Sequence, residues 1–288
     1  MSNVLLITMV SVDFRLLTSP VGIVRIFETA LTCICFSLVA SVSHSISSYW
    51  AWCMFTWCFC CFMTLFILIL EFTNLSDKVP ISWDDFTTAF AMLATLMVLA
   101  ASVIYSAIFT CPTCLQEICA SVLSWICLGL YAVEVWLAHR RPGEISGFLS
   151  TFSGLLKILE TFVACIIFTS LNPSNYNIFP GLQWCIAVYS LCFLFALLII
   201  ILTVGRLLSS FPIPFDKLVT VYNILAAVMY MSALVIWPLY AFEKNPRPID
   251  CHFCSWDKLV VVSFMTAINA IAYTFDAVYS IKLAFFTH

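Results

Sequence analysis

A basic and an acidic side chain stand three residues apart in two apolar stretches of the chain. GIVRIFETALTCICF contains Arg25 and Glu28, and GLLKILETFVACIIF contains Lys157 and Glu160. Residues three apart share one face of a helix, so each stretch would present its base and its acid together. Charges in an apolar segment are rare and usually functional or paired. Each pair therefore either takes part in chemistry or holds helices together.

Two further acids, Glu134 and Asp276, lie in apolar stretches shortly before the basic residues His139 and Lys282. Counted at 1.5 Å per residue from a helix start near residue 21, Glu28 lies roughly 10 Å along its helix, and both later acids lie at a similar depth. An unpaired charge at a membrane centre costs on the order of 2.5–3.5 kcal/mol. We predict one inward-facing polar cluster in each half of the chain, without a catalytic role: Arg25 with Glu28 and Glu134, and Lys157 with Glu160 and Asp276.

Each predicted cluster has two acids for one base. One acid in each then stays protonated or bonds a tyrosine, and Tyr131 and Tyr273 are each one turn away from an acid. An alternative is that Arg25 and Lys157 extend their charged ends to the headgroups on the cytosolic side. In the clustered arrangement the first helix of each half is fixed against the fourth.

Two CxxC pairs are the other residues whose spacing suits chemistry: Cys111 with Cys114, and Cys251 with Cys254. Each half of the chain places one pair in its second outer loop, where an oxidising exterior favours disulfides. We therefore predict a disulfide within each pair. A four-thiolate zinc site has suitable local spacing, and a thiol–disulfide oxidoreductase needs a reactive thiolate and a second cysteine, a place that Cys119 could take. The second half has no equivalent of Cys119.

No other arrangement of residues suggests catalysis, a metal or a cofactor. The seven glycines are not clustered, which excludes a phosphate-binding loop. The four histidines, His44, His139, His252 and His288, are scattered between loops and termini. We predict no catalytic, cofactor-binding or metal-binding residues.

The composition is that of an integral membrane protein. Of 288 residues, 63% are hydrophobic and 9% are charged, against about 25% charged in a typical soluble domain. The mean hydropathy is +1.08, and the net charge of −3 does not suggest a nucleic-acid partner. Eight apolar runs approach the roughly 20 residues that a helix needs to cross a bilayer. They are residues 21–42, 50–71, 85–109, 118–138, 153–171, 183–205, 218–241 and 258–281.

The basic residues indicate how these helices are oriented. If the N-terminus is cytosolic, nine of the twelve lysines and arginines lie at cytosolic helix ends or loops, as the positive-inside rule requires. Arg140 and Arg141, directly after the fourth apolar run, carry most weight. With eight helices, both termini are then predicted to be cytosolic.

The chain repeats itself. Residues 22–36 and 154–168 share seven of fifteen positions at an offset of 132 residues. The same offset aligns VPISWDDF with FPIPFDKL before the third helix, and an offset of 142 aligns Glu134 with Asp276 in the fourth. Four helices in each copy is an even number, so both copies enter the membrane in the same direction. We predict an all-α protein of two tandem four-helix membrane domains, residues 17–142 and 148–284.

The repeated unit resembles the MARVEL domain, with four helices, cytosolic ends and an acid in the first helix. Two copies in tandem, each with a G-x-x-[RK]-x-x-E-T opening and P-I-x-[WF]-D before the third helix, resemble the myeloid-associated differentiation marker family over residues 17–284. The resemblance implies a non-enzymatic multi-pass protein of plasma membrane and vesicles. It also implies a role in organising sterol-rich membrane, junctions or vesicle traffic through lateral contacts with lipids and other membrane proteins.

Two alternatives to this function remain at this point. Repeated bundles also occur in transporters and channels, but only Asn269 is central and polar, and the matching position of the first copy is Cys127. The less favoured alternative is the CxxC oxidoreductase. The sequence does not decide whether the chain forms a homo-oligomer.

Overall fold

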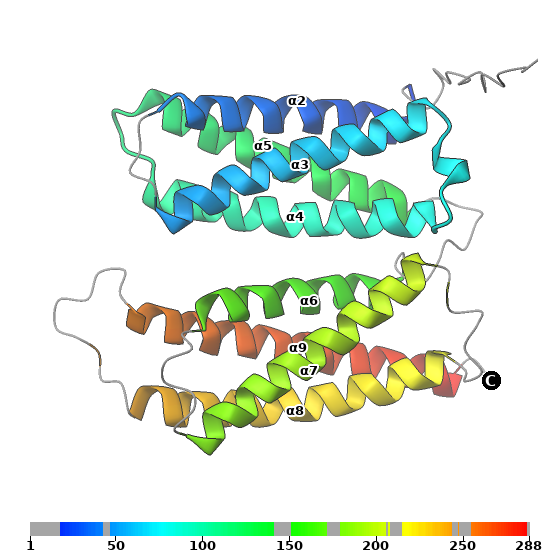
Figure 1. Cartoon of the computed structure of the whole chain (residues 1–288), viewed down its shortest axis with the longest axis vertical. Helices are drawn as coiled ribbons and strands as arrows, with labels where there is room; N and C mark the ends of the chain where they lie inside the picture. Colours follow the sequence, from blue (N-terminus) through cyan, green and yellow to red (C-terminus); the bar gives the residue numbers. More distant parts are fainter. Residues whose placement is uncertain are drawn as a thin grey trace, which may run out of the picture. The chain divides into compact units, whose positions relative to one another are not determined.

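The computed structural model describes eight long helices, each of which contains an apolar span of 19 to 28 residues (Figure 1). The prediction of an all-helical protein with eight transmembrane helices is confirmed. The described residues are 18–42, 47–140, 151–171, 179–205, 207, 215–243, 247 and 255–286. The helices are α2 (Pro20–Ala40), α3 (Ser48–Phe72), α4 (Trp83–Ile108), α5 (Leu115–His139), α6 (Phe152–Ser170), α7 (Pro180–Val204), α8 (Phe215–Glu243) and α9 (Ser255–Phe286), with a short 3₁₀ helix η1 (Ser76–Lys78) after α3.

The chain divides into two compact units, residues 1–145 and 146–288, and each unit is a bundle of four helices. Consecutive helices within a bundle run in opposite directions, so the first helix begins and the fourth ends at the same end of the bundle (Figure 1). The main helix contacts follow the order α2–α3–α4–α5 and then return from α5 to α2, and α6 to α9 repeat this order. The first and fourth helices of each bundle are therefore neighbours.

The first helix of each bundle begins in the same way. Ser19 and Thr151 are N-caps whose side-chain oxygens accept hydrogen bonds from the backbone N–H groups of Gly22 at 3.0 Å and Gly154 at 3.3 Å. Such caps satisfy donors that the first helical turn leaves without partners. Because both caps stand at the same distance before the basic residue, Arg25 and Lys157 each lie in the second turn of their helix.

Both cores contain one aromatic pair at matching positions, with its two members exchanged. In the first bundle Trp57 of α3 packs against Tyr105 of α4, with ring centroids 5.3 Å apart. In the second, Tyr189 of α7 packs against Trp237 of α8 at 6.1 Å. All four side chains are fully buried. Each bundle thus keeps one indole and one phenol between its second and third helices.

The exchanged pair also keeps its polar bond to the fourth helix. The indole Nε1 of Trp57 donates to Ser124 Oγ in α5 at 3.0 Å. In the second bundle the hydroxyl of Tyr189 lies 2.7 Å from Thr266 Oγ1 in α9. Buried aromatic side chains with a polar end usually find such a partner. Three helices of each bundle therefore meet at one aromatic site.

Gly181, in the first turn of α7, allows α7 to approach α8 closely. A Cβ atom at this position would lie 2.6 Å from two ring carbons of Tyr240 and 3.1 Å from Ile236 Cγ2. The ring of Tyr240 would therefore have to shift to make room for a Cβ atom. By contrast, a Cβ at Gly129 in α5 would meet no atom within 4 Å.

We expect Gly181→Ala to lower the thermal unfolding midpoint in mild detergent, because overpacking costs about 1–3 kcal/mol. Gly129→Ala is the matched control and should leave the midpoint unchanged or raise it, since alanine is favoured over glycine in a helix interior by roughly 0.5–1 kcal/mol. Equal shifts for the two variants would show that the contact between Gly181 and Tyr240 does not limit the packing of α7 on α8.

Candidate functional site: the buried ionic clusters

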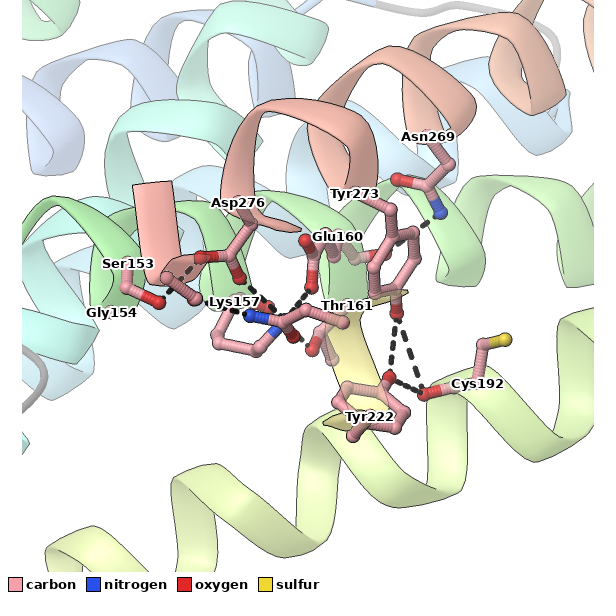
Figure 2. A network of polar contacts seen from close by, with 12 residues as sticks. Ser153, Gly154, Lys157, Glu160, Thr161, Cys192, Tyr222, Asn269, Tyr273 and Asp276 are labelled. Carbon is pink, nitrogen blue, oxygen red and sulfur yellow. Dashed lines mark hydrogen bonds and ion pairs between the residues drawn. The ribbon is translucent and has the colours of Figure 1, made fainter. Parts of the chain in front are cut away.

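The second ionic cluster consists of Lys157, Glu160 and Asp276, which the structure brings together in the core of the second bundle (Figure 2). Lys157 Nζ lies 2.6 Å from Glu160 Oε2 in the same helix and 2.7 Å from Asp276 Oδ2 in α9. All three side chains are fully buried. Ser153 Oγ also donates to Asp276 Oδ1 at 2.5 Å. One cation thus stands between two acids and joins α6 to α9.

Tyrosine rings surround the ammonium group of Lys157. Its Nζ lies 5.0 Å from the ring centroid of Tyr222 and 4.9 Å from that of Tyr273 (Figure 2). A cation over an aromatic face is attracted by the electron density of the ring, more strongly where water is absent. The two hydroxyls lie 2.9 Å apart, and Tyr222 donates to the backbone oxygen of Cys192 at 2.7 Å. Side chains or backbone from all four helices therefore contact this site.

Asn269, the central polar residue of α9, connects helices. Its Nδ2 donates to the backbone oxygen of Glu160 in α6 at 3.1 Å and to the hydroxyl of Tyr230 in α8 at 3.0 Å. The side chain is fully buried. These two bonds use both amide hydrogens between helices of one bundle, an arrangement typical of helix association in membranes.

The first ionic cluster consists of Arg25, Glu28, Glu71 and Glu134. Arg25 Nε lies 2.5 Å from Glu134 Oε1 in α5, and Arg25 Nη1 lies 2.6 Å from Glu71 Oε1 in α3. The indole Nε1 of Trp83, at the start of α4, donates to the same oxygen of Glu71 at 3.0 Å. The planar guanidinium can bind two carboxylates at once because its donors point in fixed, separate directions.

Glu28 belongs to this cluster, but it does not form the ion pair with Arg25 that the sequence had suggested. Both carboxyl oxygens of Glu28 are buried, and no hydrogen-bond donor reaches them in the part of the chain that the structure describes. The reason is the position of Glu71. Its carboxylate holds Nη1 of Arg25, while Glu134 holds Nε.

Sequence reasoning missed Glu71, although a signal was present. Glu71 is the last residue of the second predicted span and the only acid in it. An acid at that helix end lies at the same end of the bundle as Arg25, because neighbouring helices run in opposite directions. The matching position of the second copy is Thr203, whose hydroxyl donates to the backbone oxygen of Ile199. The second cluster therefore has no third acid at this place.

The cysteine pairs have different outcomes. Cys111 and Cys114 form a disulfide in the connection between α4 and α5. Cys251 and Cys254 lie outside the described residues. Cys119 is exposed on α5 and is not part of a disulfide. Within the described ranges there is no group of three or more histidine, cysteine, aspartate or glutamate side chains that could hold a metal ion.

We expect Lys157→Met to destabilise the chain strongly, because removing one partner of a buried ion pair costs about 3–5 kcal/mol. The thermal unfolding midpoint in mild detergent should fall clearly. Lys258→Met, the same substitution at an exposed position of α9, is the control and should have little effect. If both variants unfolded at the temperature of the unchanged chain, the cation would not hold α6 against α9.

Comparison with protein families agrees with this architecture. The model of the MARVEL family, described as a membrane-associating domain, matches residues 16–137 and again residues 148–279. These two matches cover most of the chain and correspond to the two bundles. No solved structure matches the chain.

Similar proteins extend the comparison to nearly the whole chain. The myeloid-associated differentiation marker homolog of Xenopus laevis is 41% identical over 94% of this chain and 95% of its own length. The human myeloid-associated differentiation marker is 41% identical, over 94% of this chain and 90% of its own length. The mouse myeloid-associated differentiation marker-like protein 2 is 40% identical, with 93% of each chain covered. The chain therefore belongs to the myeloid-associated differentiation marker family, multi-pass membrane proteins with two MARVEL domains in tandem.

Proposed function

We propose that this protein is a non-enzymatic organiser of plasma membrane and vesicle membrane, which acts through lateral contacts with lipids and other membrane proteins. The observation that carries the proposal is the direction of its side chains. The charged residues deep in the helices point into each bundle, where most of them form ion pairs. Large apolar side chains point outward, such as Phe62, Leu194 and Phe264. Among the described residues, the lipid-facing helix surfaces are thus the surfaces that we propose for these contacts.

Sterol-rich membrane is the environment that we propose for these surfaces. Phe55, Phe62 and Phe66 are exposed on α3, and the last two rings are stacked with centroids 6.4 Å apart. Flat, rigid apolar side chains of this kind suit contact with ordered lipid. Helices of a neighbouring membrane protein are the other class of partner, and a second copy of the chain is one such neighbour.

The proposed orientation places both termini in the cytosol. The excess of basic residues at the corresponding helix ends supports it. The disulfide between Cys111 and Cys114 supports it independently, because disulfides persist on the oxidising side of the plasma membrane. The connection between α4 and α5 is then outside the cell.

Transport is the weaker alternative, because Asn269 and the ionic clusters bond helices to one another in the present arrangement. A thiol–disulfide oxidoreductase would need a second cysteine close to the disulfide, and Cys119 lies on an exposed face of α5. Free thiols that appear and disappear at Cys111 and Cys114 on intact cells would favour this last activity.

The proposed function is tested in giant vesicles derived from plasma membrane that separate into ordered and disordered phases. We expect the fluorescently tagged chain to concentrate in the ordered phase, and a variant with Phe55, Phe62 and Phe66 changed to leucine to lose part of this preference. A variant with leucine at the buried Phe90 controls for altered packing. Equal distribution between the phases, or selective flux of an ion or solute through reconstituted vesicles, would contradict the proposal.

The orientation is tested with epitope tags on intact cells. A tag inserted at residue 144 and tags at both termini should be labelled only after permeabilisation, because all three are proposed to be cytosolic. A tag between Thr110 and Cys111 should be labelled without permeabilisation. Labelling of the tag at residue 144 from outside would reverse the proposed orientation.

A further inference from the structure

Glu28 is the one member of the first ionic cluster whose charge is left without compensation. Its side chain is fully buried in the membrane-spanning helix α2. No donor among the described residues reaches either carboxyl oxygen. A buried carboxylate without a cation or a hydrogen-bond donor is strongly unfavourable in an apolar medium, so such a group normally becomes neutral.

The neighbours of Glu28 do not supply the missing charge. α2 packs against α3 and α5, and the carboxyl group of Glu28 interacts with another carboxyl, that of Glu134 in α5. Arg25 is near, but its Nε and Nη1 are bonded to Glu134 and Glu71. The other ionisable side chains near Glu28 are Cys60 of α3, and Cys127 and Tyr131 of α5, and none of them can carry a positive charge.

We propose that Glu28 binds a proton and donates it in a hydrogen bond to Glu134, so that the two carboxyls share one proton. Two carboxylates in contact repel each other, whereas a carboxylic acid and a carboxylate attract. With the proton in place, the pair needs only one positive charge, which Arg25 provides to Glu134. The ligand of this buried site is thus the proton itself.

The second bundle differs at the matching position. Glu160 occupies the position of Glu28, and Lys157 lies 2.6 Å from it. Lys157 is free to do so because Thr203 stands where Glu71 stands in the first bundle. Glu71 therefore creates the proton site by drawing the basic residue away from its neighbour on α2.

Glu71 also connects the site to the surroundings of the bundle. Its side chain is 19% exposed, whereas those of Arg25 and Glu134 are 5% and 3% exposed. Glu71 is thus more accessible than either Arg25 or Glu134. A change at Glu71 should alter whether Glu28 keeps its proton, although the two acids are on different helices.

Infrared spectroscopy of the full chain in lipid nanodiscs tests the proposal. A protonated carboxylic acid has a carbonyl stretch at a higher frequency than a carboxylate, and this band shifts in D₂O. We expect the difference between the unchanged chain and Glu28→Gln to contain one such band. Glu243→Gln, at an exposed position of α8, should produce none. Identical spectra for the unchanged chain and Glu28→Gln in this region would overturn the proposal.

Substitution of Glu71 gives a second test. Glu71→Thr should remove the Glu28 band, because Arg25 can then turn to Glu28 as Lys157 turns to Glu160. Persistence of the band in Glu71→Thr would show that Glu71 does not create the site.

Thermal unfolding provides a readout that does not depend on the assignment of a band. Glutamine resembles a neutral carboxylic acid, so Glu28→Gln should leave the unfolding midpoint almost unchanged. Glu160→Gln should lower it, because that substitution removes an ion pair with Lys157. If Glu28→Gln lowered the midpoint as much as Glu160→Gln, Glu28 would be charged and the proposal would be wrong.

Discussion

A charge inside a membrane needs an opposite charge beside it, and this requirement determines how each bundle is arranged. Arg25 and Lys157 lie in the second turn of their helices and are fully or almost fully buried, so it would be costly to leave them without partners. Each finds an acid on the fourth helix of its bundle, at 2.5 Å for Arg25 and 2.7 Å for Lys157. The adjacency of first and fourth helices, the antiparallel order and the position of the aromatic pairs are all compatible with this contact. The ion pair selects one arrangement among helices whose apolar faces alone would accept several.

Most of the fold could be predicted from the sequence because membrane helices are long and uniformly apolar. The eight spans, the tandem repeat and the juxtaposition of Lys157 with Glu160 and Asp276 follow from length, offset and depth. The ends of the helices are predicted less accurately. α9 runs from Ser255 to Phe286 and so extends beyond the apolar run, residues 258–281, at both ends. Charged and polar residues extend a helix past the hydrocarbon without any signal in hydropathy.

The first ionic cluster could not be predicted completely, because partner choice depends on three-dimensional competition. Arg25 and Glu28 share a helix face at the spacing of Lys157 and Glu160, and sequence spacing alone treats the two pairs as equivalent. Only the approach of α3 shows that Glu71 competes for the same guanidinium. A single difference between the copies, glutamate or threonine at the end of the second helix, thus changes the partner of a residue on another helix.

The exchanged aromatic pair has a consequence for biogenesis. As eight similar helices leave the ribosome one after another, α3 must recognise α4 although α8 descends from the same ancestral segment. Association of α3 with α8 would bring Trp57 against Trp237, and two indoles would be too large for the site. Association of α7 with α4 would bring Tyr189 against Tyr105 and leave a gap. Overfilled and underfilled cores both cost stability. Pairing within each bundle therefore keeps one large and one smaller ring at this site, whereas pairing between the copies would change the volume that the core must hold.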